Sequence, residues 1–435
     1  MIEIIQIIFQ IILILFLFIF INPVSLMGQS TPQNYSNFKN INLNILISLN
    51  LILILGILNF KLSNIILVYV IFISSCFFIN FLNKRENYFN DFHTLFFLFL
   101  ITLILSIDVS YNLFLTWDAQ KLWFFKTLNF YNNNNLDNLN NLPNSHYPFL
   151  GSLLWATFWK LSLLQNEYSG RIFYIFLFII SIFSLVEILN KNKITKFILL
   201  TLIISLIYKY ELFGGDQDII IFCLITMASK EIYLIISKNQ NKAQSLILLI
   251  LISNALIWVK NEGTIYALSL TLITILFGNL KLNYKISLVL GFLISVLMRV
   301  LIFKIYNFSI HINPCCYTDF SITSILNKIS FDRIFLILTY IFYSFLQNII
   351  FVAFILFNLI LFFTKNIKIK NFYFIYFFLF FHISFISGAS LMTDVPLEFQ
   401  LKTSVNRLMF QGLGFYILFI IQLINDYSTK IKKIN

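Results

Sequence analysis

Apolar runs long enough to cross a membrane recur along the whole chain of 435 residues. A membrane-spanning helix needs about 20 mostly apolar residues to cross roughly 30 Å of hydrocarbon. The chain is 59% hydrophobic and 11% charged, which leaves too little polar surface for a soluble domain of this size. The runs also lack the alternation of barrel strands and are much longer than the ~10 residues that such strands need. The sequence therefore predicts an all-α, polytopic membrane protein.

The apolar runs predict about 13 transmembrane helices. Residues 334–363 are too many for one perpendicular helix, so this run is either one tilted helix or a pair broken near Gln347 and Asn348. The predicted spans cover residues 4–21, 43–60, 65–82, 94–110, 171–189, 196–211, 218–237, 245–260, 263–278, 286–304, 334–363, 371–390 and 408–424.

If each predicted span crosses the membrane once, the short loops that carry basic residues all fall on one side. An excess of basic residues in short loops marks the cytoplasmic side. They are Lys84, Arg85, Lys191, Lys193, Lys196, Lys238, Lys242, Lys281, Lys285, Lys365, Lys368, Lys370, Lys430, Lys432 and Lys433. Their thin spread favours membrane orientation over nucleic-acid binding, although the net charge is +12. The lipid bilayer is therefore an expected partner, and nucleic acid is not.

The basic loops all fall on one side only if the apolar segment 149–164 does not cross the membrane. It would lie at the outer interface or re-enter, and its aromatic residues suit an interfacial helix. We then expect residues 1–93 to form an N-terminal extension of three spans, and residues 94–280 to form a core with a large external loop at 108–170. Residues 281–435 would close the core with further transmembrane helices.

Five polar clusters emerge on the side opposite the basic loops: TWDAQKLW, SHYPFL, GGDQD, VKNEG and TDVPLEFQLKTSVNR. In the first, Asp118 lies at headgroup depth between tryptophans. There it can act as a general base on a hydroxyl or hold a metal. A solvated loop aspartate explains the same pattern. In the second, His146 can orient a phosphate or share in proton transfer, although an isolated histidine is more often a surface residue. Tyr147 beside it is a candidate substrate contact.

The other clusters carry charges at the ends of spans. Asp216 and Asp218 have a spacing that suits a divalent cation, but helix capping explains them equally. Lys260 and Glu262 are costly at a membrane edge unless they are paired or functional. Lys260 can bind a lipid-linked phosphate or snorkel to the surface. Arg407 can clamp a phosphate, or it can belong to an amphipathic interfacial segment.

The order of these clusters resembles a branch of the bacterial GT-C membrane glycosyltransferases, relatives of the protein O-mannosyltransferases and the lipid A aminoarabinose transferase. The resemblance covers scattered motifs between residues 94 and 424. The matching residues are Trp117, Asp118, Ala119, Trp123, His146, Tyr147, Pro148, Asp218, Lys260, Asn261, Glu262, Gly263, Thr403, Ser404 and Arg407.

The resemblance implies a multi-helix enzyme that takes its sugar from a polyprenyl phosphate and works on the periplasmic side of a bacterial inner membrane. It implies that Asp118 is the key catalytic carboxylate and that Asp218 is the second. The acceptor would be a glycan, lipid or protein, and a divalent cation is a possible cofactor. The chain departs from relatives that carry two prolines at the Pro148 site, and it has Ile220 where they often have proline.

Two other classes of function remain open. A transporter or flippase of lipid-linked sugars would place ionisable residues along a path inside the spans, and Glu187, Glu231 and Arg299 are its candidates. A membrane scaffold would need no polar site at all. Geometry separates these readings, because an enzyme requires Asp118, Asp218, Lys260 and Arg407 to meet at one external site, which a scaffold does not.

Overall fold

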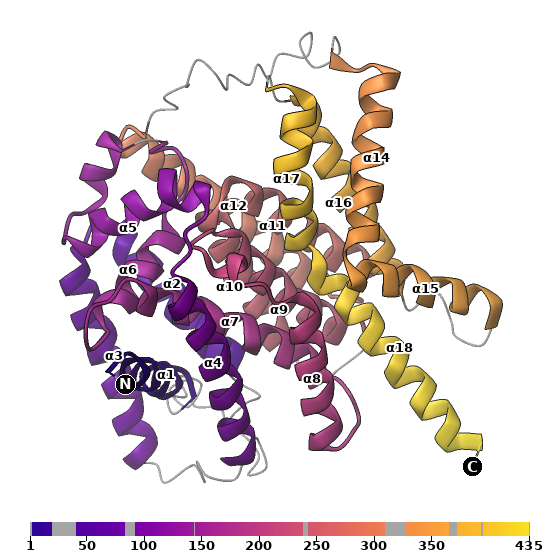
Figure 1. The fold of residues 1–435 in the computed structure, drawn as a ribbon, viewed down its shortest axis with the longest axis horizontal. Helices are drawn as coiled ribbons and strands as arrows, with labels where there is room; N and C mark the ends of the chain where they lie inside the picture. The colour runs from indigo at the N-terminus through magenta and orange to yellow at the C-terminus, as the bar shows by residue number, and fades with distance from the viewer. Residues whose placement is uncertain are drawn as a thin grey trace.

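The computed structural model describes residues 2–19, 41–82, 92–142, 144–237, 242–308, 328–364, 372–392 and 395–434. Within these ranges every secondary-structure element is a helix (Figure 1), so the all-α prediction is confirmed there. Several basic residues used for the orientation lie outside the described residues: Lys84, Arg85, Lys238, Lys365, Lys368 and Lys370. The same is true of the side chains of Lys430, Lys432 and Lys433.

Seven helices in the described chain are long and apolar enough to cross a membrane, or up to nine if two bent pairs each count as one span. The seven are α3 (Leu62–Leu82), α4 (Phe92–Asn112), α7 (Tyr168–Val186), α9 (Asp218–Ile236), α10 (Lys242–Val259), α12 (Leu282–Ile305) and α16 (Tyr373–Met392). Shorter apolar helices are α1 (Ile2–Ile19), α2 (Ile41–Ile57) and α11 (Asn261–Phe277). These helices support a membrane protein.

The long apolar run at 334–363 is a broken pair. Helix α14 (Phe331–Gln347) and helix α15 (Ile349–Thr364) meet at Asn348 with a bend of 92° (Figure 1). The Asn348 side chain accepts a hydrogen bond from the Ile350 amide at 3.0 Å, which satisfies one of the free donors at the start of α15. Of the two alternatives for this run, the break near Asn348 is therefore the one that forms.

The predicted external loop 108–170 is mostly helical. It contains a π-helical turn η3 (Ala119–Trp123), α5 (Phe124–Tyr131), a 3₁₀ turn η4 (Leu136–Asn141) and α6 (Leu150–Lys160). The Asn-rich stretch is tied to the α2–α3 turn, because Asn59 donates to Asp137 at 2.8 Å and the Ser63 hydroxyl donates to Asn133 at 2.6 Å. Leu136 is buried beneath these contacts.

Helix α6 forms inside the segment predicted to lie at the membrane interface, but its aromatic side chains do not face lipid. Phe149, Trp155, Phe158 and Trp159 are all buried. The Phe158 ring stacks on Phe173 of α7 with centroids 4.1 Å apart. The interpretation of these rings as interfacial anchors is therefore wrong, because α5 and α7 pack over them. Eleven residues extend only about 16 Å, so α6 is too short to cross a bilayer.

The first helices dock on the predicted core through buried polar contacts. In α1, Gln6 donates to Ser169 at 2.5 Å, and Gln10 donates to the Phe158 carbonyl at 2.9 Å. In α2, Asn50 accepts a hydrogen bond from Asn254 of α10 at 2.7 Å. The division of the chain at residue 93 stays a prediction.

The last predicted external loop is largely helix. Residues Leu397–Gln411 form α17, and the chain bends by 44° into α18 (Leu413–Ile434). The predicted span 408–424 therefore covers the end of α17 and the first part of α18, and Arg407 lies near the carboxyl end of α17 rather than at the start of a helix. The prediction missed α17 because its sequence mixes polar and apolar residues. In Figure 1, α17 stands beside α14 and α16, and α18 runs down to the C-terminus. The remaining elements are α8 (Lys193–Ile207) and the short turn η5 (Tyr210–Phe213).

Candidate active site

Five of the predicted site residues meet in one ionic cluster, which consists of Asp118, Asp218, Lys260, Glu262 and Arg407. The guanidinium of Arg407 is paired with Asp118, and its Nε lies 3.2 Å from Asp218 Oδ2. The Lys260 ammonium lies 2.8 Å from Asp218 Oδ1 and 3.6 Å from Glu262 Oε1. Residues up to 289 positions apart in sequence are thus in direct contact.

The cluster has a buried floor and a more open rim. The side chains of Asp218 and Lys260 are 5% and 3% exposed, whereas those of Asp118, Glu262 and Arg407 are 20%, 22% and 33% exposed. The rim residues are therefore the ones that a substrate can reach first. Asp218 is positioned instead to hold the two cations.

The loops that carry Asp118 and Asp218 are joined to each other. The Thr116 amide donates to the Gly214 carbonyl at 3.0 Å. Gly215 then turns the chain with a φ of +89°, a backbone conformation that favours glycine. A Cβ on Gly215 would lie 2.5 Å from the Trp155 ring and 3.0 Å from Ala119. This close packing sets the separation of the two aspartate-bearing segments.

Arg171 fastens the same two loops and was not predicted as a site residue. Its side chain is 1% exposed and donates to the carbonyls of Phe114 and Phe213 at 2.8 and 3.0 Å. Glu167 balances its charge at 2.9 Å. An arginine at the start of an otherwise apolar span is the sequence signal that could have identified it.

Lys260 occupies a tight break between α10 and α11. A Cβ on Gly263 would lie 1.9 Å from the Leu256 carbonyl oxygen, so only glycine fits this turn. Arg299 of α12 holds the break by donating to the Ile257 carbonyl at 3.0 Å, to Thr264 at 2.9 Å and to Asn261. Arg299 was a candidate for a transport path, but these contacts give it a structural role beside the cluster.

Gln411 is a further residue that sequence reasoning missed. It lies one helical turn after Arg407 on α17, and its amide donates to Asp218 Oδ1. A single neutral amide in an apolar context carries no charge signal in the sequence. Its contact nevertheless places two side chains of α17 on the same carboxylate.

Negative charge exceeds positive charge at this site. Asp216 lies beside the cluster, and its Oδ1 is buried without a hydrogen bond among the described residues. Burial and the neighbouring Asp218 raise the pKa of Asp216 to about 7. Burial opposes the charge on Lys260, but Asp218 and Glu262 outweigh it and raise its pKa. Among the described residues, the carboxylates of Asp118, Asp216, Asp218 and Glu262 thus outnumber the two cations of the cluster, Lys260 and Arg407.

Tyr147 borders the cluster, and His146 packs on Tyr147. Their rings lie 4.7 Å apart, and Tyr147 also packs edge-on against Trp123 at 5.7 Å. Burial and the charge of Glu262 raise the pKa of Tyr147. The Tyr147 carbonyl accepts a hydrogen bond of 2.6 Å from Lys126, a fully buried lysine that was not predicted as a site residue. Burial and the charge of Arg299 lower the pKa of Lys126 to about 7.

The described residues contain no group of three or more His, Cys, Asp or Glu side chains arranged to hold a metal ion. Asp216 and Asp218 alone would supply too few ligands for a closed site. Magnesium often binds through one or two carboxylates together with substrate phosphates, and the unbonded Asp216 oxygen suits that mode. A divalent cation therefore stays a prediction.

Comparisons of the chain with protein-family models, with curated proteins and with solved structures found no match.

Proposed function

We propose that the chain is a membrane glycosyltransferase that moves a sugar from a polyprenyl phosphate to an acceptor hydroxyl. The observation that carries this proposal is the contact of Asp118, Asp218, Lys260 and Arg407 in one cluster. Charges removed from water cost several kcal/mol each, even when they are paired. A scaffold gains nothing from assembling them out of four distant segments, whereas an enzyme needs such a site.

In the proposed reaction, Asp118 takes the proton of the acceptor hydroxyl. The acceptor oxygen attacks the anomeric carbon, a new glycosidic bond forms, and the bond from that carbon to the phosphate oxygen breaks. Polyprenyl phosphate leaves with the bonding electrons, and the sugar inverts its configuration. Asp118 suits this role because it combines partial exposure with a fixed position at the start of η3.

Arg407 would link donor binding to the release of Asp118. Its guanidinium is paired with Asp118 while it also lies 3.2 Å from Asp218. A donor phosphate that binds Arg407 competes with Asp118, which then becomes available to the acceptor. Lys260 would support the leaving phosphate from the floor of the site, and Asp218 and Gln411 would keep both cations in place.

We propose about 13 spans in a GT-C-like arrangement, with the shorter apolar helices, helix α8 and the bent pairs counted among them. The site would face the periplasm of a bacterial inner membrane. The acceptor would be a glycan, a lipid or a protein, and His146 and Tyr147 would contact the substrate at the edge of the site.

The test is turnover by the full chain in detergent with a panel of polyprenyl-phosphate sugars. Wild type should release free polyprenyl phosphate, and Asp118→Asn should lose at least about 100-fold in rate, because it removes the proton acceptor. Asp137→Asn is the matched control. It changes an exposed carboxylate of the same external region, which bonds Asn59 outside the cluster, and it should keep full activity.

Other outcomes count against the proposal. Full activity of a folded Asp118→Asn protein would remove the base role. Binding of the donors without turnover, together with their movement across a vesicle membrane, would favour a transporter of lipid-linked sugars. Failure to bind any donor would contradict the glycosyltransferase proposal itself.

A further inference from the structure

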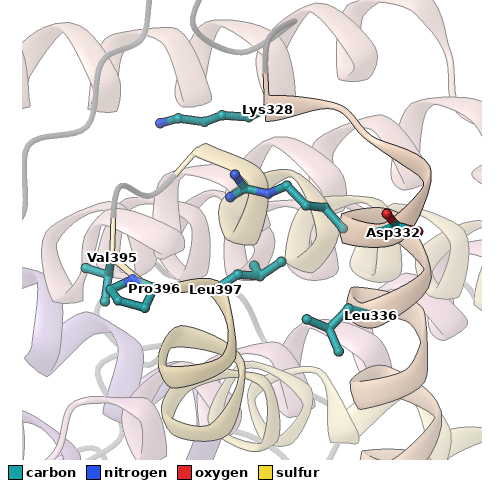
Figure 2. A pocket seen from close by; sticks show the side chains of 7 residues that line it. Lys328, Asp332, Leu336, Val395, Pro396 and Leu397 are labelled. Carbon is teal, nitrogen blue, oxygen red and sulfur yellow. The ribbon is translucent and has the colours of Figure 1, made fainter.

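A second polar site lies between the amino-terminal ends of α14 and α17. It is a cavity of about 450 Å³ lined by Lys328, Asp332, Arg333, Leu336, Val395, Pro396 and Leu397. Figure 2 shows Asp332 and Leu336 on α14 facing the segment Val395–Leu397, with Lys328 extending across the opening. None of these residues belongs to the ionic cluster.

The lining combines cationic and apolar groups. Among the lining residues that the structure describes, Lys328 and Arg333 supply two cations and Asp332 supplies one carboxylate. The Nε of Arg333 is buried and makes no hydrogen bond to any described residue. The Arg333 side chain as a whole is half-buried, so its guanidinium stays accessible from the cavity, and an anion there would satisfy the Nε donor. Leu336 and Leu397 supply apolar walls next to these charges.

The backbone adds to the preference for an anion. Helix α14 begins at Phe331 and helix α17 begins at Leu397, so both amino-terminal ends lie at the cavity. The free amides of helix amino termini favour negative charge, although the Ser330 side chain already accepts a hydrogen bond from the Arg333 amide at the start of α14. The Pro396 cap of α17 provides no side-chain hydrogen bond to those amides. Two helix ends and two basic side chains thus meet at one opening.

The cavity is separate from the proposed reaction centre. Leu397 precedes Arg407 by ten residues on the same helix, which corresponds to about 15 Å along its axis. A phosphate held by Arg333 is therefore too far away to be the leaving phosphate at Arg407.

We propose that this cavity binds the phosphate group of an amphiphilic ligand. Arg333 would pair with the phosphate oxygens, Lys328 would add a second cation, and the leucines would contact the apolar part of the ligand. The phosphate can come from a lipid headgroup or from a soluble phosphate ester. The apolar walls favour the lipid, and the experiment separates the two sources. The inference does not depend on glycosyl transfer.

The test measures binding to the purified full chain in detergent, with short-chain phosphatidic acid and inorganic phosphate as separate probes. Wild type should bind phosphatidic acid, and Arg333→Gln should weaken that binding at least tenfold. Lys402→Gln is the matched control, because Lys402 is an exposed cation on α17 that pairs with Glu398 at 3.8 Å. It should bind as wild type does.

A second variant tests whether the loss of binding could result from misfolding of Arg333→Gln. Lys328→Gln changes a different element at the rim of the cavity and should also weaken binding, with an unchanged melting temperature. Tighter binding of phosphatidic acid than of inorganic phosphate supports a lipid ligand, and equal binding supports a soluble ester. Absence of binding to both probes would overturn the proposal, as would equal binding by wild type and a folded Arg333→Gln protein.

Discussion

Lys260 shows how strongly single residues depend on their partners in this protein. Its ammonium is 3% exposed and contacts two carboxylates, while a third lies beyond them at Asp118. If the ammonium is removed, Asp218 stays buried with Arg407 as its remaining cation. Buried ion pairs respond sharply to the loss of one member, because the other charge has no access to water.

We therefore expect Lys260→Met to destabilise the protein by about 3 to 5 kcal/mol. Thermal unfolding in detergent measures the effect as a lowered melting temperature. Lys402→Met is the control, because its pair with Glu398 is exposed, and exposed pairs contribute less than about 1 kcal/mol. Equal melting temperatures for both variants would contradict the buried-pair interpretation.

Asp216 makes stability depend on pH in a direction that is unusual for a carboxylate. Its pKa is raised from 3.8 to about 7, so the folded state holds a proton that the unfolded state releases at lower pH. The resulting stability is complete below about pH 4 and is lost as the pH rises through about 7.

Asp216→Asn keeps this position neutral and should remove that loss. We expect the variant to be more stable than wild type at pH 8 by at least about 1 kcal/mol, since one pKa unit corresponds to roughly 1.4 kcal/mol. The advantage should shrink towards pH 5. Melting curves over this pH range are the measurement, and a difference that grows on acidification would refute the assignment.

At the scale of elements, short breaks between helices position the site. The turn at Gly215 sits against Trp155, the turn at Gly263 sits against the Leu256 carbonyl, and the α17–α18 bend follows Gln411. Each break places a polar residue next to the cluster. At two of the breaks the packing leaves no room for a Cβ, so glycine is needed to position the charged residues.

Gly215→Ala should destabilise the protein by at least about 1 to 3 kcal/mol, because the residue has a positive φ and a Cβ would overlap the Trp155 ring. Gly388→Ala in α16 is the matched control. Nothing lies within 4 Å of a Cβ there, and alanine favours a helix, so the expected change is at most about 1 kcal/mol towards greater stability. The melting temperatures of the two variants decide between these outcomes.

Sequence patterns predicted the long helices well, because apolar length is a local property. They also offered the break at Asn348 as one of two alternatives. Helix α17 was missed, since its stability comes from packing against α14 and α9 rather than from an apolar run. The members of the cluster were predicted from polar motifs, but the pairing of Arg407 with Asp118 depends on tertiary contacts. Gln411 was missed because a neutral amide carries no charge signal, whereas Arg171 could have been identified from its position at the start of an apolar span.

At the scale of the whole molecule, the threading predicts that the cluster faces one side of the membrane and the basic loops face the other. Asp137→Cys should react with a membrane-impermeant maleimide added outside intact cells, in a background where the native cysteines are replaced. Lys193→Cys at the start of α8 should react only after the membrane is permeabilised. The reverse pattern would invert the proposed topology.

The right-angled break at Asn348 has a consequence for the surrounding lipid. Helix α14 has 17 residues and is about 25 Å long, which is shorter than the roughly 30 Å of a typical hydrocarbon core. If α14 runs along the membrane normal, α15 adds little to that height, because it turns away by 92°. A bilayer that meets α14 would thin locally to avoid hydrophobic mismatch. The elements that frame Arg407 and the Arg333 cavity would then sit in a shallow depression of the leaflet, where long lipid-linked substrates meet the protein closer to the membrane midplane.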